Sequence, residues 1–137
     1  WSIHAENNAK IWNLSQIISN FLCHYTEPAK HIPAWLESAY EKMKHPQNFI
    51  AGTDRMFQLS GKTREHVARL MKQYYHTTPT DFVNELRLEH AAKLLLMSNL
   101  PVTDICYECG FENLSWFYKS FLRKFGVTPA SYRKDAQ

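Results

Sequence analysis

The sequence contains few of the residues that end strands and build phosphate-binding loops, with only 4 glycines and 6 prolines among 137 residues. Strand-and-turn folds and glycine-rich nucleotide-binding folds need more of both. Three cysteines, an odd number, argue against a disulfide-stapled secreted scaffold. No apolar run is long enough to span a bilayer, and no signal-peptide pattern opens the chain. These absences predict a soluble, helical, cytoplasmic protein with no membrane partner.

The sequence does contain enough hydrophobic residues to form the core of one small domain, since 45% of its residues are hydrophobic and 14% are aromatic. Its net charge is only +3, from 16 basic and 13 acidic residues, and so modest a total identifies no polyanionic partner. The charges of residues 1–30 cancel, so the whole surplus lies in the rest of the chain. Because the first residue is Trp1 and not an initiator methionine, we expect a piece of a longer protein.

Residues 1–30 carry apolar side chains at spacings of three and four, which predicts an amphipathic helix. The stripe consists of Ile11, Leu14, Ile18, Phe21, Leu22 and Tyr25. Glu27-Pro28 ends this helix. A helix with so apolar a stripe needs a partner, which is either the body of the protein or a second copy. A homodimer through residues 1–30 is therefore one hypothesis.

After residue 30, capping and breaking residues predict helices throughout. Ser60-Gly61 separates two short helices, which is typical of a helix, a tight turn and a second helix. The run Thr78-Pro79-Thr80-Asp81 supplies an N-cap, a proline at the first helical position and an acidic residue, so a long helix starts there. Asn99-Leu100-Pro101 ends it. The long helix is predicted over residues 79–98.

The segment after the long helix repeats the segment before it. Shifting the chain by 50 residues superposes Thr53-Asp54 on Thr103-Asp104 and Thr78-Pro79 on Thr128-Pro129. The matches fall at caps and break points, whereas chance matches would scatter. We therefore predict an all-α fold, in which two helix-turn-helix subdomains are joined by a long linker helix and preceded by the amphipathic helix. The subdomains are predicted at residues 33–78 and 99–134.

Residues 114–134 contain five basic residues and no acid. A positive helix face beside a glycine turn suits the DNA major groove, where Arg and Lys donate to guanine edges and phosphates. Charge alone favours the alternative, a solvated face on an ordinary helical bundle. The duplication favours DNA, because two units on one strut can place two reading helices about 34 Å apart, one turn of DNA.

The same residues resemble the signature of AraC/XylS transcription factors. The matching positions of the second unit are residues 102–111, Ser115-Trp116-Phe117, Lys119, Phe121, Lys124, Gly126-Val127-Thr128-Pro129 and Tyr132-Arg133. Those of the linker and first unit are Arg87-Leu88, Ala91, Leu94-Leu95, Leu59-Ser60-Gly61 and Arg69. The resemblance covers residues 33–134 and implies a seven-helix DNA-binding domain whose third and sixth helices read adjacent major grooves of double-stranded operator DNA. It also implies RNA polymerase as a partner.

Site residues follow from this resemblance position by position. The positions that would face bases are Glu65, Ala68 and Arg69 in the first unit and Ser115, Trp116 and Lys119 in the second. The positions that would face phosphates are Arg64, Lys72, Asn113 and Arg123. Two residues depart from the family pattern. Ala68 is too short to hydrogen-bond a base and could touch only a thymine methyl, and Cys106 replaces the usual small alanine.

A narrower set of residues resembles regulators of chitobiose-type sugar operons. It comprises Pro33-x-Trp35-Leu36, Glu41-Lys42-Met43, Tyr74-Tyr75, Thr78-Pro79 and Asn84-Glu85-x-Arg87. This resemblance implies a sugar-utilisation operon as target and a sugar-sensing domain before the DNA-binding part. Residues 1–30 would then be the last helix and linker of that sensor or dimerisation domain.

Two further readings of the chain remain open. The first is a helical dimerisation module that reads no bases, and the second is a thiol-based sensor through Cys106 and Cys109. Buried, inert thiols are favoured over a sensor or zinc site, because no other ligands occur at metal-binding spacing. We expect no metal, no cofactor and no enzyme, since no nucleophile or carboxylate pair recurs at useful spacing. Trp116 should point out of the core, where it contacts DNA or covers the helix surface.

Overall fold

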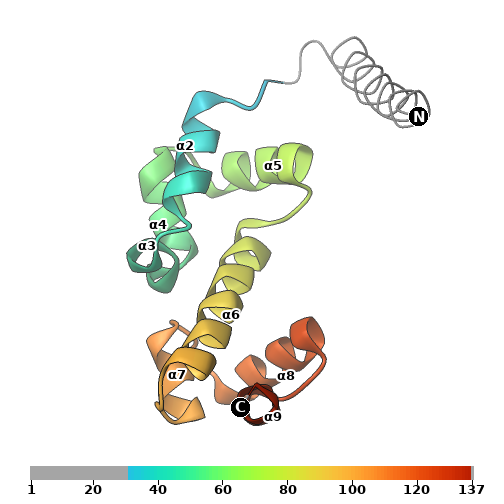
Figure 1. The fold of residues 1–137 in the computed structure, drawn as a ribbon. Helices are drawn as coiled ribbons and strands as arrows, with labels where there is room; N and C mark the ends of the chain where they lie inside the picture. Colours follow the sequence, from blue (N-terminus) through green and yellow to red (C-terminus); the bar gives the residue numbers. More distant parts are fainter. Residues whose placement is uncertain (1–30, 137) are drawn as a thin grey trace, which may run out of the picture. The chain divides into compact units, whose positions relative to one another are not determined.

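The computed structural model describes residues 31–136, and the predicted pair of helix-turn-helix units joined by a long helix is confirmed there. The predicted amphipathic helix lies outside these residues. The helices of residues 31–136, in chain order, are α2 (Ala34–Lys42), α3 (Pro46–Ala51), α4 (Thr53–Ser60), α5 (Arg64–Tyr75), α6 (Pro79–Met97), α7 (Val102–Glu108), α8 (Leu114–Phe125) and α9 (Pro129–Asp135) (Figure 1). None of them is long and apolar enough to cross a membrane.

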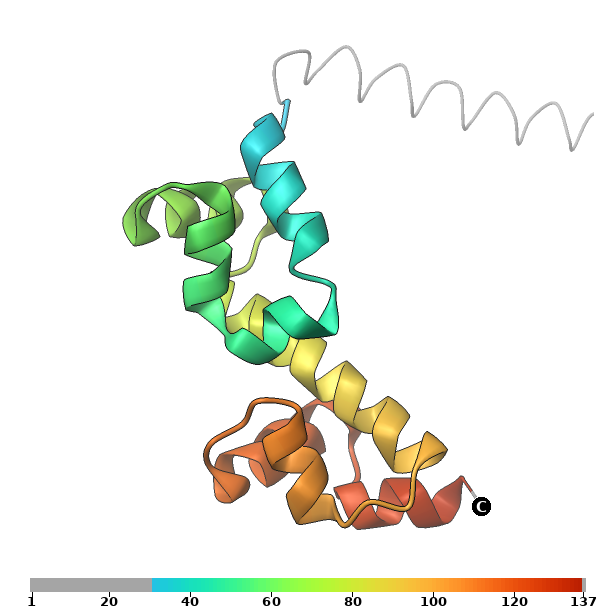
Figure 2. The same cartoon turned by 90° about the vertical axis from the view of Figure 1, so that its left-hand side faces the viewer.

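Helix α6 is the connecting strut, 19 residues long, and its ends are set by local chemistry. The Thr78 side chain accepts a hydrogen bond from the Asp81 backbone N–H (3.1 Å), and Pro79 occupies the first turn, as its sequence predicts. At the other end the Ser98 hydroxyl donates to the Leu94 carbonyl (2.7 Å). Figure 2 shows α6 running from the first group of helices to the second.

The first unit, α2 to α5, packs an aliphatic and methionine-rich core against the start of α6. Its fully buried side chains include Leu36, Met43, Met56, Val67 and Met71. Three aromatic rings close one side of this core. Tyr40 stacks between Tyr75 and Phe82, with ring centroids 3.9 and 4.4 Å apart. Because Phe82 lies on α6, this stack ties the strut to the first unit.

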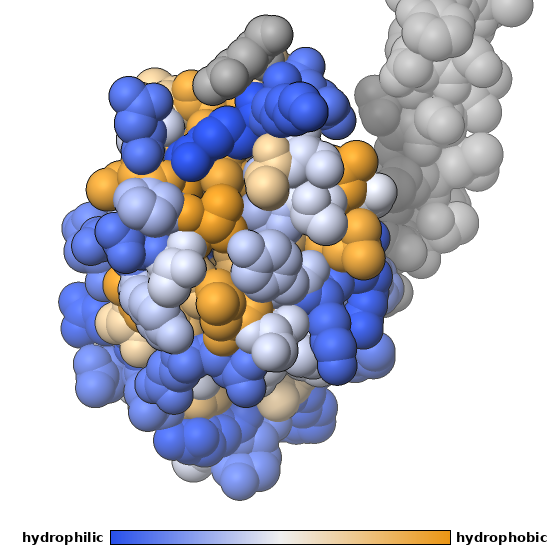
Figure 3. All heavy atoms as spheres, turned by 90° about the horizontal axis from the view of Figure 1, so that it is seen from below, coloured by the Kyte–Doolittle hydropathy of each residue, from blue (hydrophilic) through white to orange (hydrophobic). Residues whose placement is uncertain are grey.

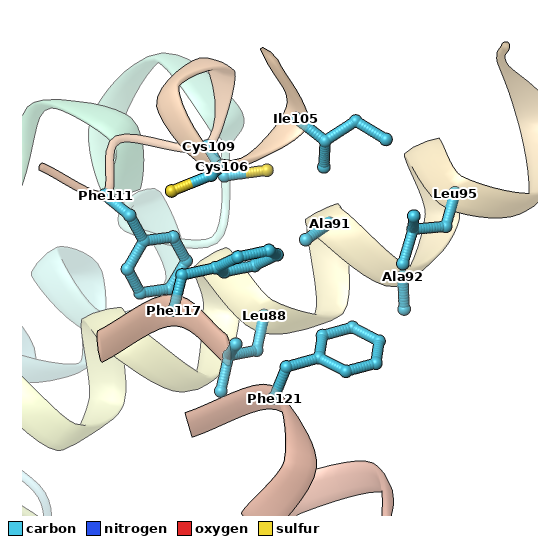
Figure 4. Close-up of a cluster of buried hydrophobic side chains, with 10 residues drawn as sticks. All are labelled: Leu88, Ala91, Ala92, Leu95, Ile105, Cys106, Cys109, Phe111, Phe117 and Phe121. Carbon is cyan, nitrogen blue, oxygen red and sulfur yellow. The ribbon is translucent and has the colours of Figure 1, made fainter. Parts of the chain in front are cut away.

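The second unit, α7 to α9, packs aromatic rings against the rest of α6 (Figure 4). Helix α6 supplies four aliphatic residues, α7 and its end supply Ile105 and two cysteines, and Phe111, Phe117 and Phe121 fill the centre. The Phe111 and Phe117 rings lie 5.1 Å apart, a distance typical of favourable aromatic pairs. Burying each such side chain contributes roughly 1.5–3 kcal/mol, so these rings are a main source of stability in this unit.

The repeat is real, but its register shifts by one residue within each unit. Helices α5 and α8 have 12 residues each and begin 50 positions apart, and so do α6 and α9. The preceding helices correspond at 49 positions instead, since α4 begins at Thr53 and α7 at Val102. The predicted match of Thr53-Asp54 with Thr103-Asp104 is therefore one residue out. The cause is a longer turn before α8, which includes the buried Phe111.

Viewed from the end formed by the second unit, the surface is mainly hydrophilic, with apolar patches between the hydrophilic side chains (Figure 3). Exposed large hydrophobic residues of this unit and of the end of α6 are Leu96, Met97, Leu100, Tyr107, Trp116 and Leu122. Met97, the last residue of α6, is 82% exposed.

Candidate nucleic-acid interface

Helices α5 and α8 lie on the same side of α6, one beside each half of the strut (Figure 1). Each is the second helix of its helix-turn-helix, and each presents an exposed polar face opposite its buried residues. The cap of α5 is Thr63, whose side chain accepts from the His66 backbone N–H (3.2 Å). Asn113 caps α8 in the same way through the Trp116 N–H (3.0 Å). The two candidate reading helices thus begin at defined residues.

On α5, four of the five predicted DNA-facing residues are exposed, namely Arg64, Glu65, Arg69 and Lys72. Ala68 is half-buried, so its methyl group is only partly available. Arg64 is engaged within the protein, because its guanidinium donates to Asp54 (2.6 Å) and lies 5.1 Å from the Phe57 ring. Both partners of this ion pair are 68% exposed, so water screens the attraction and a phosphate can compete for Arg64.

The Arg69 side chain is hydrogen-bonded to His66, a contact that was not predicted from the sequence. Its Nη2 donates to Nδ1 of His66 (2.9 Å), one helical turn earlier. The His66 ring stacks on Trp35 of α2 at 5.2 Å, and the Lys62 ammonium lies 5.4 Å from the same indole. This chain of contacts connects the exposed face of α5 to α2. The spacing of three between His66 and Arg69 was the only sequence signal that could have indicated it.

On α8, Asn113, Ser115, Trp116, Lys119 and Arg123 are all exposed. The Trp116 indole is 45% exposed, and the inward positions belong to Phe117 and Phe121, in agreement with the predicted orientation. Helix α8 contains no acidic residue, so its exposed face is positive. The Asn113 side-chain oxygen Oδ1 accepts the cap hydrogen bond, which leaves the side-chain NH₂ group free to act as a donor.

The basic run of residues 114–134 is divided between the surface and the interior of the fold. Lys124 pairs with Glu85 (3.1 Å) and Glu89 (3.7 Å) of α6. Arg133 donates to the carbonyls of Leu95 in the last turn of α6 and of Ser98 and Leu100 just after that helix, at 3.0, 3.3 and 2.7 Å. Three of the five basic residues remain exposed, Lys119 and Arg123 on α8 and Lys134 on α9, so the positive face of α8 is smaller than the sequence indicated.

Two grooves border Trp116. One, of about 490 Å³, lies between the start of α4, α6 and the turn before α8. The other, of about 610 Å³, lies between the start of α6 and α8 and is also lined by Arg123 and Ser120. Asn84 of α6 and Trp116 line both. Asn84 was not predicted as a site residue, and it is a further polar group in both grooves beside Trp116.

The thiol groups lie in the core of the second unit, where Cys106 and Cys109 are both fully buried and reduced. Burial raises the pKa of the Cys109 thiol to about 12, with further contributions from Cys106 and Glu108. Burial also raises the pKa of Cys106. Because the thiolate is the reactive form, this geometry gives no support to a thiol-based sensor. Within residues 31–136 no group of three His, Cys, Asp or Glu side chains is placed to hold a metal ion.

Two helix-turn-helix units that share a strut and present two capped helices on one side of it define a tandem helix-turn-helix DNA-binding domain. The comparisons with known proteins agree with this class. A family model described as "Helix-turn-helix domain" matches residues 55–135. A transcriptional regulator from Chromobacterium violaceum, described as containing an AraC-type DNA-binding domain, superposes with a TM-score of 0.64 at 30% identity, covering 73% of this chain and 89% of that one. The chain therefore belongs to the AraC family of helix-turn-helix transcriptional regulators.

Curated relatives are similar over the same region. The HTH-type transcriptional regulator GlxA of Rhizobium meliloti is 37% identical over 102 residues, 74% of this chain and 31% of that protein. The HTH-type transcriptional activator RhaS of Escherichia coli O9:H4 is 38% identical over 101 residues, 74% of this chain and 34% of that protein. The chain thus spans about a third of the length of these two regulators.

Proposed function

We propose that α5 and α8 enter successive major grooves of an operator, with Glu65, Ala68 and Arg69 facing bases in one half-site and Ser115, Trp116 and Lys119 in the other. The observation that carries this proposal is the placement of the two capped, exposed helices on one side of α6. Arg64, Lys72, Asn113 and Arg123 face phosphates. These charge contacts supply much of the affinity and make it fall with salt.

Selection of binding sites from random duplexes tests this arrangement. A bipartite motif with half-sites about 10 bp apart is expected, because that spacing is one turn of DNA. A single short motif would show that only one helix reads bases. Replacing Lys119 should change only one half of the motif, and replacing Arg69 only the other.

The remaining parts of the proposal concern the longer regulator. Residues 31–137 are its DNA-binding domain, and residues 1–30 end a sensor or dimerisation domain in a cytoplasmic protein whose target is a sugar-utilisation operon. The sequence likeness to chitobiose-type regulators supports this target. Mapping genomic sites of the full-length regulator tests it, because the sites should lie upstream of sugar-uptake genes. Sedimentation with and without residues 1–30 tests the homodimer, and a monomer in both cases would remove it.

RNA polymerase is the proposed protein partner, and the exposed apolar residues at the end of α6 support a protein contact there. Met97 is 82% and Leu96 50% exposed, and neither belongs to the proposed DNA-facing set. A Met97→Ser variant should keep its DNA affinity and lose transcriptional activation in a reporter assay. Unchanged activation would exclude Met97 from the polymerase contact.

A further inference from the structure

Arg87, in the middle of α6, joins the strut to the first unit. Its Nε donates to the Phe49 carbonyl (2.9 Å) and its Nη2 donates to the Ile50 carbonyl (2.9 Å), both in the last turn of α3. The last four carbonyls of a helix have no i+4 partner within it, and of these two only the Phe49 carbonyl has another backbone donor, the Gly52 N–H (3.2 Å). The planar guanidinium fork satisfies two of them at once, which a lysine ammonium cannot do with the same geometry.

The turn before α8, which belongs to the second unit, lies against Arg87 and the end of α3. Gly110, in the turn before α8, lies so close that a Cβ added to it would be 2.7 Å from the Ile50 carbonyl oxygen and 2.9 Å from Arg87 Nε. The Phe111 ring lies 5.9 Å from the guanidinium carbon. The end of α3, the Arg87 side chain and the Gly110 turn therefore form one junction between the two units.

Electrostatic attraction also stabilises this junction. The negative end of the α3 peptide dipoles attracts the Arg87 guanidinium, and so does the Glu112 carboxylate of the second unit's turn. Both units thus act on the same half-buried cation. Removing the guanidinium leaves the Ile50 carbonyl without this donor, while the Phe49 carbonyl keeps only its bond from the Gly52 N–H, and it removes the group that lies against the Gly110 turn.

We infer that Arg87 is a positioning residue for DNA recognition, which holds the turn before α8 against α3 and thereby fixes the distance and angle between α5 and α8. A single helix joining two units leaves them free to bend and twist about it, and a second attachment point removes that freedom. The half-sites must then match one spacing, because a shift of one base pair turns the second half-site about 35° around the DNA axis. This inference rests on the proposed two-groove binding.

Arg133 provides a matched control. Like Arg87, it donates to backbone carbonyls, three in this case, but those of Leu95 in the last turn of α6 and of Ser98 and Leu100 just after it all lie inside the second unit. Arg133→Met should lower stability without loosening the relation between α5 and α8. Arg87→Met should do both. Comparing these two variants separates a loss of folding from a loss of positioning.

The experiment uses the full 137-residue chain and duplexes whose half-sites, taken from the selected motif, are moved apart or together in steps of one base pair. The parent and Arg133→Met should prefer one spacing and bind neighbouring spacings about tenfold more weakly, whereas Arg87→Met should bind neighbouring spacings within about threefold of each other. All titrations are made where circular dichroism shows each variant folded, and Arg87→Lys replaces Arg87→Met if the latter is unfolded.

The outcomes distinguish the inference from the function on which it rests. An Arg87 variant that binds all spacings more weakly by the same factor, with the parent's preference intact, would overturn the inference. A parent that selects a motif with only one half-site would overturn the two-groove proposal itself. Loss of spacing preference in both arginine variants would mean that general loosening, and not the junction at Gly110, is responsible.

Discussion

The two helix-turn-helix units have the same arrangement of helices but different core side chains. The first unit buries Met43, Met56 and Met71, whereas the second buries Phe111, Phe117 and Phe121. Methionine is flexible and adapts to irregular gaps, while aromatic rings pack in fewer ways. The same backbone arrangement therefore tolerates two kinds of core, provided that the capped helices and the turn between them are kept.

The exposed faces of the two reading helices differ as well. On α5, Arg64 is paired with Asp54, and Arg69 is bonded to His66. On α8, Lys119 and Arg123 form no side-chain hydrogen bond or ion pair with the other residues of the described range 31–136. In the proposed complex the α5 side chains are therefore partly ordered before DNA binds, and those of α8 lose more rotamer freedom on binding.

The largest expected difference between the units concerns their equivalent turn glycines, Gly61 and Gly110. Gly110→Ala should cost about 2–5 kcal/mol of unfolding free energy, because its φ of 98° is strained for alanine and the new Cβ would overlap the Ile50 carbonyl. Gly61→Ala should cost only about 1 kcal/mol, since its φ is 68° and nothing lies within 4 Å. Urea unfolding measures both. Equal losses would contradict the close contact at Gly110.

Next in size is the effect of each reading helix on binding. Arg69→Ala and Lys119→Ala should each weaken DNA binding by about 1–3 kcal/mol and relax base preference in opposite halves of the operator. Gel-shift titrations against duplexes altered in one half at a time measure this, with Lys134→Ala as a control of similar charge. Variants that bind every sequence as tightly as the parent would refute the two-reader arrangement.

Alkaline pH should act on the second unit through Cys109. Its pKa is raised from 9.0 to about 12, so above pH 9 the unfolded chain loses this proton while the folded chain keeps it. Stability present below pH 9 is then lost as the pH rises toward 12, by about 1 kcal/mol at pH 10. Unfolding free energies at pH 8 and pH 10 measure the loss, and Cys109→Ala should reduce it. An identical pH dependence in the variant would exclude this thiol as the source.

The smallest effect concerns the residues that end the reading helices. The C-cap residue of α5 is His76 with φ 57°, and that of α8 is Gly126 with φ 77°, both left-handed. Because a side chain is disfavoured in this conformation, His76→Gly should raise the unfolding free energy by about 0.5–1 kcal/mol, and Gly126→Ala should lower it by a similar amount. Thermal unfolding of the two variants checks the opposite signs.

Local features of the fold were predictable from the sequence, and distant contacts were not. Thr78 and Asn113 indicated where α6 and α8 begin, because a cap bonds to a residue three positions away. The period of the helix indicated which residues of α5 and α8 are exposed. The partners of Arg87, Lys124 and Arg133 lie 33 to 39 positions away, so no spacing rule could reveal them.

The sharing of α6 has a consequence for how the molecule could be divided. Phe82 and Val83 at one end of α6 complete the first core, while Leu88, Ala91 and Leu95 at the other complete the second. Cutting the chain just before or just after this helix would deprive one unit of the α6 side chains that complete its core. The duplicated units are therefore not interchangeable modules that can be excised or recombined, and the pair forms the smallest part of the chain with both cores complete.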